Sequence, residues 1–312
     1  MVTKSGKPLG ALPFRILGDA RAELGESPVY DDTRACFWWV DCAGKQLFRT
    51  HWSTGRTDVW HTPERPGFVC LTDTGSVAVG METGIYEFDD QTAHFAAKVA
   101  LDLKGFRFND AVVDPAGILW TSVQQIDGPQ GAGKLVRVSD QGNIEVLRDG
   151  LTFPNGMAVD AARDRFYYSD SHAAHQKVWT IPWSSGPTPI EEHRVFVDFS
   201  SRSGRPDGAA LDCDGNYWIA AVDTGAIEVF APDGTPLAHY QTPFDSITKI
   251  AFGGPRLSHV LVTSKGGDTP NGGVAIAHLE TGVEGQPPSR WRKPDARTPP
   301  NSPRSRTQTP GM

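Results

Sequence analysis

The sequence predicts an all-β protein and, within that class, a six-bladed β-propeller. Long helical periodicity is hard to find in the 312 residues. Short runs of β-branched and aromatic residues are instead bounded by Gly, Asp, Asn and Pro, which is typical of many strands joined by tight turns. One unit also recurs along the chain: a turn that carries Asp and Gly, followed by a strand of bulky residues.

The recurring unit is found six times at near-equal spacing. It occupies residues 31–41, 71–80, 113–123, 159–170, 211–222 and 252–264. The strand centres lie near residues 38, 77, 119, 166, 217 and 260, so successive steps are 39, 42, 47, 51 and 43 residues. A repeat of roughly 40–50 residues with several strands per unit is typical of a propeller blade. A two-sheet sandwich is the alternative, but it does not account for six similar units.

Further strands are expected after each recurring unit, to complete the blades. They are predicted at residues 46–52, 84–89, 134–139, 177–183, 226–232 and 273–279. The propeller domain is expected to span residues 14–290. Residues 291–312 are rich in Pro, Arg, Ser and Thr and carry almost no apolar side chains. We therefore expect a tail that is disordered and adds nothing to activity.

Composition narrows the classes of partner. A net charge of −7 without a long basic run in the body argues against nucleic acid as a partner. No apolar run approaches the length of a membrane-spanning helix, and the N-terminus lacks a signal-peptide core. The four cysteines form neither a zinc pattern nor a disulfide framework. We expect a cytoplasmic protein that is a monomer or weak dimer.

Polar residues recur at one phase of the repeat. Ten to twelve residues before four of the strand centres stand Glu26, Asn109, Asn155 and Asp207. Equal phase around a closed ring means equal height near the axis, so these side chains are expected in one small space. Carboxylate and amide oxygens suit a hard divalent cation such as Ca²⁺, Mg²⁺ or Mn²⁺. The alternative is that each residue only caps a turn, as Asn155 would in Phe-Pro-Asn-Gly.

The other two blades differ at this phase. The step back from residue 77 reaches Gly67 and Phe68, and the step from residue 260 reaches Thr248 and Lys249. Histidines offer no second metal site, because His172 and His175 lack further ligands and are expected to be exposed loop residues. The strand tryptophans are expected to pack within blades: Trp38, Trp39, Trp120 and Trp218.

Several motifs in register resemble the family of senescence marker protein (regucalcin), gluconolactonase and luciferin-regenerating enzyme. They read LGESPVY, RFNDAVVDPAGILW, FPNGMAVD with FYYSDS, RPDGAALDCDGNYWIA, and ITKIAFGGP with VLVTS. They follow the family's order over about residues 18–290. The resemblance implies a six-bladed propeller with one divalent metal in its channel, held by Glu26, Asn155 and Asp207. It also implies that Arg107 and Asn109 contact the substrate.

The resemblance further implies a hydrolase that opens a sugar lactone, such as gluconolactone or xylonolactone, to the aldonic acid. Thr248 and Lys249 resemble the sugar-lactonase branch of the family. Asp207 would ligate the metal and accept a proton from the attacking water, and Arg107 would hold hydroxyls or developing charge. The cation could be Ca²⁺, Zn²⁺, Mn²⁺, Mg²⁺ or Fe²⁺. The alternatives are an esterase or phosphotriesterase of the same fold, and a non-catalytic calcium-binding protein.

Overall fold

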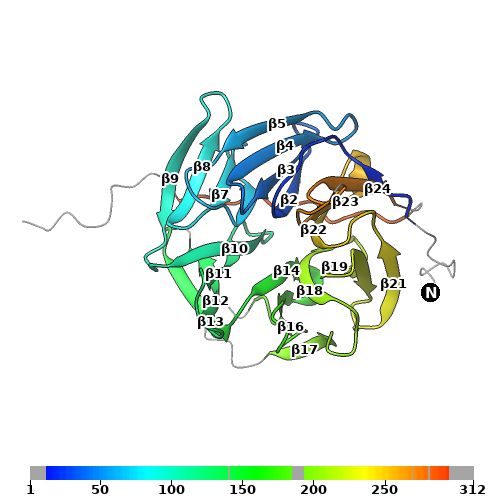
Figure 1. Cartoon of the computed structure of the whole chain (residues 1–312). Helices are drawn as coiled ribbons and strands as arrows, with labels where there is room; N and C mark the ends of the chain where they lie inside the picture. The colour runs from blue at the N-terminus through cyan, green and yellow to red at the C-terminus, as the bar shows by residue number, and fades with distance from the viewer. Residues whose placement is uncertain (1–11, 140, 185–192, 269, 280–281, 295–312) are drawn as a thin grey trace, which may run out of the picture.

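The computed structural model describes residues 12–139, 141–184, 193–268, 270–279 and 282–294. Within these residues, 24 strands form six four-stranded antiparallel sheets. The sheets stand around a common axis, as Figure 1 shows. The predicted six-bladed β-propeller is therefore confirmed, and the sandwich alternative is wrong.

We number the blades in chain order, each from its inner strand outward. Blade 1 contains β2 (Gly25–Asp31), β3 (Cys36–Asp41), β4 (Gln46–His51) and β5 (Thr57–His61). Blade 2 contains β6 (Phe68–Leu71), β7 (Val77–Gly80), β8 (Gly84–Asp89) and β9 (His94–Ala100). Blade 3 contains β10 (Phe106–Val113), β11 (Leu119–Gln125), β12 (Gly133–Val138) and β13 (Ile144–Leu151).

The second half of the ring follows the same plan. Blade 4 contains β14 (Pro154–Asp160), β15 (Arg165–Asp170), β16 (Lys177–Ile181) and β17 (Arg194–Asp198). Blade 5 contains β18 (Arg205–Leu211), β19 (Tyr217–Val222), β20 (Ala226–Phe230) and β21 (Pro236–Gln241). Blade 6 contains β22 (Ile247–Gly253), β23 (His259–Ser264), β24 (Val274–His278) and β1 (Arg15–Ile16). Two short 3₁₀ helices, η1 (Ala161–Arg163) and η2 (Pro255–Leu257), lie in blades 4 and 6.

Blade 6 closes the ring with strands from both ends of the described chain. Arg15 and Ile16 of β1 pair antiparallel with Ile276 and Ala275 of β24. Each inner strand also contacts the inner strands of the two neighbouring blades, including β22 with β2. Closure of this kind leaves no blade without a neighbour.

The six predicted strand centres all fall in second strands, namely β3, β7, β11, β15, β19 and β23. The preceding inner strands line the axis. A step of ten to twelve residues back from a centre therefore reaches the strand next to the channel in five blades, and in blade 2 it reaches the residues just before β6. This is why equal phase in the sequence corresponds to a common position around the channel.

A repeated contact explains the recurring Asp and Trp of the sequence. Trp120 Nε1 donates to Asp114 Oδ2 at 2.9 Å, and Trp218 Nε1 donates to Asp212 Oδ2 at 3.0 Å. In both blades the carboxylate also accepts backbone N–H groups of the tight turn, for example that of Ile118 at 2.9 Å. A buried indole N–H needs such a partner. The strand tryptophans are buried, which confirms that they pack within the blades.

The C-terminal segment after β24 crosses one face of the ring. The side chain of Trp291 is buried, with the residue 1% exposed. Its backbone N–H donates to Leu71 O at 2.8 Å, and its backbone carbonyl accepts from Asp73 N at 3.0 Å. Arg290 Nη2 contacts Asp32 Oδ1 at 2.9 Å, and Lys293 pairs with Glu87. The predicted boundary at residue 291 is therefore too early, because one large apolar side chain is buried just beyond it. Residues 295–312 lie outside the described residues, so the expectation for them stays a prediction.

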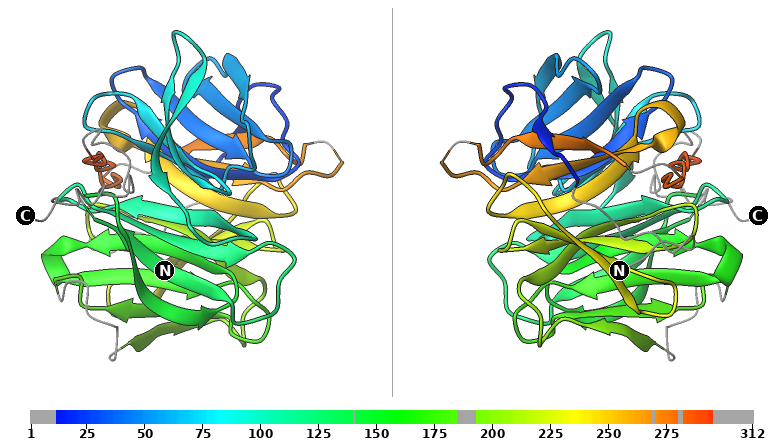
Figure 2. Two further views of the ribbon diagram at one scale, coloured as in Figure 1. Left: turned by 90° about the vertical axis from the view of Figure 1, so that its left-hand side faces the viewer. Right: turned by 90° about the vertical axis from the view of Figure 1, so that its right-hand side faces the viewer.

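The two faces of the ring are distinct. The inner strands begin at one face, which we call the mouth face, and end at the other, which we call the far face. In Figure 2 the segment near residue 290, drawn in red, lies at the far face, and the β23–β24 connection projects from the mouth face. Among the described residues no helix is long and apolar enough to cross a membrane.

Candidate active site

Bulges in the inner strands place the polar residues found by phase. In five blades the pairing of the inner strand with the second strand shifts across two residues. The shifts fall between Glu26 and Val29, Phe108 and Ala111, Asn155 and Ala158, Pro206 and Ala209, and Ile247 and Ile250. A bulge turns a side chain out of the regular alternation. Blade 2 pairs regularly from Phe68 to Leu71, which matches its lack of a polar residue at this phase.

The two asparagines join neighbouring blades. Asn109 Nδ2 donates to Asn155 Oδ1 at 3.1 Å and to Pro154 O at 3.2 Å. Asn155 Nδ2 donates to Ser171 Oγ at 3.0 Å, and Ser171 Oγ donates to Pro206 O at 2.7 Å. Asn155 therefore has a fixed amide orientation, and its Oδ1 keeps a second lone pair for another partner.

Two carboxyl groups at the same level lack a full set of partners. Burial, and after it the negative charge of Asp110, raises the pKa of Glu26 to about 7. Burial, with Glu26 and Asp110 as further causes, raises the pKa of Asp207 well above its ordinary value. Asp207 Oδ1 is buried and accepts no hydrogen bond. Buried polar atoms are rarely left in this state, so the arrangement favours a bound cation.

Beneath these acids lies an ion pair that the sequence analysis missed. Lys249 Nζ donates to Asp110 Oδ1 and, at 3.1 Å, to Ala111 O. Asp110 Oδ2 accepts from Met157 N at 2.9 Å. Asp110 was missed in the sequence because one polar residue was considered at the repeated position of blade 3, and that residue was Asn109. The signal was present, since Asp110 follows Asn109 within the same bulge.

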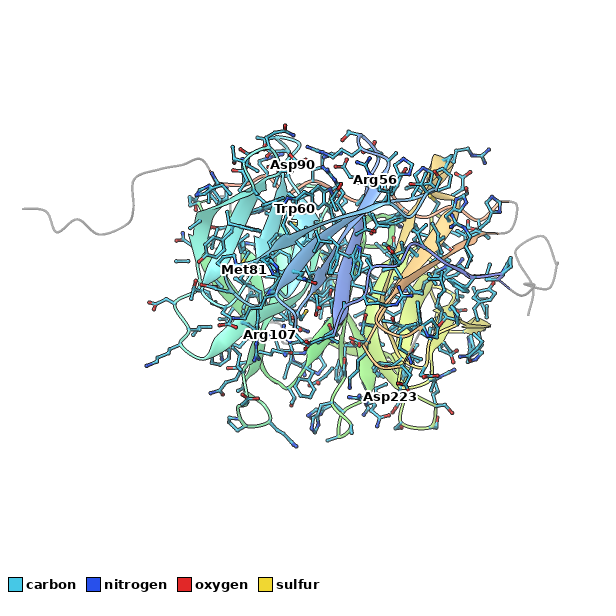
Figure 3. The ribbon with its side chains drawn as sticks, turned by 45° about the horizontal axis from the view of Figure 1, so that its top comes forward. Arg56, Trp60, Met81, Asp90, Arg107 and Asp223 are labelled. Carbon is cyan, nitrogen blue, oxygen red and sulfur yellow. The ribbon has the colours of Figure 1, made fainter. Side chains whose placement is uncertain are left out.

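Arg107 lies at the mouth end of β10. Its Nη1 donates to Phe108 O at 2.9 Å, and it pairs in register with Gln124 of β11. Figure 3 labels Arg107 and Asp223 toward the lower edge of the view, away from Arg56 and Asp90 at the upper edge. That placement agrees with the mouth face, where Asp223 follows β19. A half-buried guanidinium there can offer its remaining donors to a ligand entering the channel.

The remaining residues singled out from the sequence have structural contacts. Thr248 Oγ1 contacts Gly25 O and, at 2.8 Å, Thr263 Oγ1, which ties blade 6 to blade 1. His172 and His175 lie in the connection after β15 with their ring centroids 5.9 Å apart. His175 is exposed and His172 half-buried, and neither is part of the acid cluster.

The far half of the channel is an apolar cavity of about 410 Å³. All six inner strands line it, and the C-terminal residues 286–289 form its far wall. Typical lining residues are Val69, Val113, Val159 and Leu211, and Lys249 lies at its inner end. Glu26, Asn155 and Asp207 are not among the lining residues. The candidate active site is therefore the polar mouth, and this cavity lies behind it.

The donor set fits a hard cation, although the structure does not establish a metal centre. Over the described ranges, no three His, Cys, Asp or Glu side chains gather closely enough to hold a metal. The ligands implied by the resemblance include one amide, so such a triad is not required. Glu26 and Asp207 supply carboxylate oxygens and Asn155 an amide oxygen, which are ligands that Ca²⁺, Mg²⁺ and Mn²⁺ accept.

Fold and site together describe a six-bladed propeller whose central channel has an acidic, polar mouth. The family model for the SMP-30/Gluconolactonase/LRE-like region matches residues 24–266. The chain belongs to this family, which confirms the resemblance seen in the motifs.

Several relatives have lactonase names, and others are regucalcins. A pentonolactonase of Haloferax volcanii is 28% identical over 284 residues, covering 87% of this chain and 96% of that protein. A 6-deoxy-6-sulfogluconolactonase of Pseudomonas putida is 31% identical over 243 residues, covering 77% and 83%. The crystal structure of a calcium-binding protein, regucalcin, from Agrobacterium tumefaciens shares the fold, with a TM-score of 0.83 and 24% identity over 91% of this chain and 99% of that one.

Proposed function

We propose that the protein is a lactonase that uses a divalent metal to hydrolyse a sugar lactone to its aldonic acid. The observation that carries the proposal is Asp207 Oδ1, a buried oxygen without a partner, whose nearest acids include the half-buried Glu26. Membership of a family whose relatives include lactonases supports the same reading. It agrees with the enzyme class that the motifs imply.

Glu26, Asn155 and Asp207 would hold the metal, because they come from blades 1, 4 and 5 and converge on the mouth. A divalent cation at such a site lowers the pKa of water and polarises an ester carbonyl. Asn109 keeps the amide of Asn155 in place through its 3.1 Å hydrogen bond. The amide ligand is therefore ordered before the cation arrives, which reduces the cost of binding.

The reaction adds water to the lactone carbonyl and breaks the bond between the acyl carbon and the ring oxygen. A proton leaves the attacking water, and the ring oxygen gains one to become a hydroxyl group. Asp207 is the base that we assign to the first transfer, since its Oδ1 has no other hydrogen-bond partner. Arg107 and Asn109 offer donors to substrate hydroxyls and to the developing oxyanion.

The test is a substrate panel with purified protein. The protein is stripped with a chelator and then reloaded separately with Ca²⁺, Mg²⁺, Mn²⁺ or Zn²⁺. Gluconolactone, xylonolactone, an aryl ester and a phosphotriester are each followed with a pH indicator. Metal-dependent turnover that is highest on an aldonolactone supports the proposal. Turnover confined to the aryl ester or phosphotriester favours the same-fold hydrolase, and metal binding without turnover on any of them favours a calcium-binding protein.

A further inference from the structure

The ion pair of Lys249 and Asp110 spans the channel. Lys249 belongs to β22 of blade 6, and Asp110 belongs to β10 of blade 3. In a closed ring of six blades these two face each other across the axis. Lys249 is 6% exposed and Asp110 is 4% exposed, so neither charge is solvated at the surface.

The local structure is shaped to hold this pair. Asp110 accepts backbone N–H groups from Met157 at 2.9 Å and Ala111 at 2.8 Å, so its carboxylate is fixed from two blades. The side chain of Lys249 passes directly over Gly208, where any added Cβ would collide with its methylenes. The glycine beside Asp207 therefore makes room for the lysine.

A buried ion pair is weak evidence for stability, because desolvation offsets much of the attraction between its charges. The charges of this pair also act on the site above it. Lys249 passes over Gly208, the residue that follows Asp207. Asp110 follows Asn109, whose amide donates to Asn155 Oδ1 at 3.1 Å. Both members of the pair therefore lie beside residues of the proposed metal site, where their charges act on an ion held there.

We propose that Lys249 is a positioning residue that sets the charge of the site, so that the channel favours a divalent cation over a trivalent one. By neutralising Asp110, it leaves Glu26 and Asp207 as the two carboxylates to be balanced by the ion. Without Lys249, the negative charge of Asp110 would be unopposed beneath the two acids and would add to the field at the ion. The inference rests on the proposed metal site. It adds the residue that determines which ionic charge the site prefers.

The experiment measures the affinity for La³⁺ and for Ca²⁺ by calorimetry on metal-free protein at low ionic strength. Lys249→Met keeps the length and the apolar stem of the side chain but removes its charge. We expect the ratio of La³⁺ to Ca²⁺ affinity to rise about tenfold or more, because one added negative charge attracts the trivalent ion more strongly. A merely structural lysine would change both affinities together and leave this ratio unchanged.

Two further variants keep the test decisive if Lys249→Met folds poorly. Asp110→Asn leaves the lysine charge unopposed, so the same ratio should fall about tenfold. The double variant restores the wild-type charge, and its ratio should return to within about threefold of wild type. Near-ultraviolet circular dichroism checks that each variant is folded.

Each outcome has one meaning. An unchanged ratio in a folded Lys249→Met or Asp110→Asn protein overturns the inference and leaves the metal site standing. If wild type binds neither cation, the metal site itself is wrong, and the role of Lys249 falls with it. Arg107 and Arg205 are present in every variant, so their charges do not affect the comparison.

Discussion

Single inner strands have opposite chemistry at their two ends. In β18, Asp207 lies near the mouth face, whereas Leu211 lines the apolar cavity near the far face. In β14, Asn155 and Val159 show the same contrast. The pairing shifts occur between these positions, and regular alternation resumes after each one. A bulge thus lets one short strand serve a polar site and an apolar wall without disturbing the rest of its blade.

If the mouth half is the chemical half, Asp207→Asn should give the largest effect. The substitution keeps the shape but removes a charge and the proposed proton acceptor, so we expect kcat to fall about a thousandfold or more. Metal affinity measured by calorimetry should fall much less. Asp245→Asn is the matched control, since it removes an exposed carboxylate from the connection between blades 5 and 6 at the same face. A kcat within tenfold of wild type in Asp207→Asn would remove this residue from the role of base.

The far half should affect stability and not chemistry, and Trp291→Ala tests this. The side chain is buried against the cluster that contains Phe68, Val99 and Leu119. Its removal should lower the free energy of unfolding by about 3–5 kcal/mol, as measured by urea denaturation. Trp291→Phe, which keeps an aromatic ring, should lose less. A kcat that falls at a temperature where the protein remains folded would contradict the division between the two halves.

Substitutions of Asn155 test whether this residue of the mouth binds the metal or only holds its turn. Asn155→Ala removes the amide oxygen, so we expect metal affinity to fall about ten- to a hundredfold and turnover to fall with it. Asn155→Asp keeps an oxygen ligand and adds a charge, so it should still bind metal. Calorimetry and lactone hydrolysis give both readouts. An Asn155→Ala protein that matches wild type in both would show that the residue only holds its turn.

The smallest effect is expected from Glu87 at the far face, whose contribution to the free energy of unfolding depends on pH. Burial alone would raise the pKa of Glu87, but hydrogen bonds from Lys293, Ser76 and Lys98 outweigh it and hold this pKa at about 2. Because the folded-state pKa lies below the ordinary 4.5, the contribution is present above pH 4.5 and is lost as the pH falls toward 2.

The measurement for Glu87 is the difference in unfolding free energy between wild type and Glu87→Gln at pH 6 and at pH 3. We expect wild type to be more stable than Glu87→Gln by less than about 1 kcal/mol at pH 6, and by a smaller amount at pH 3. Gln91→Ala, which removes an exposed and uncharged side chain between β8 and β9 of the same blade, is the control. A difference that grows at low pH would contradict the assignment.

The sequence was sufficient for the ring because a propeller repeats one local pattern. A turn precedes each second strand, and the strand itself contains bulky residues. Both features can be identified in the sequence without knowledge of distant contacts. The same regularity led to Glu26, Asn109, Asn155 and Asp207. Their role as metal ligands or substrate contacts remains a prediction, because no contact in the structure identifies a bound ion.

What could not be predicted depended on contacts across the ring. The partner of Lys249 is in the opposite blade, and nothing local to either residue indicates the pairing. Trp291 lies in a segment whose composition is that of a solvated tail, and its burial depends on a gap between blades 2 and 3 that only the assembled ring creates. Composition averages over a segment, so it conceals one anchoring side chain.

The closure of blade 6 has a consequence for the order in which the protein can be completed during synthesis. β1 is translated before the other described strands, but its partner β24 is translated only after five blades. Until then the nascent chain has an open ring, and the inner strand β2 lacks its neighbour β22. Closure of the ring therefore requires a contact between distant parts of the chain, and contacts of this kind are in general slow to form and leave incomplete chains open to association.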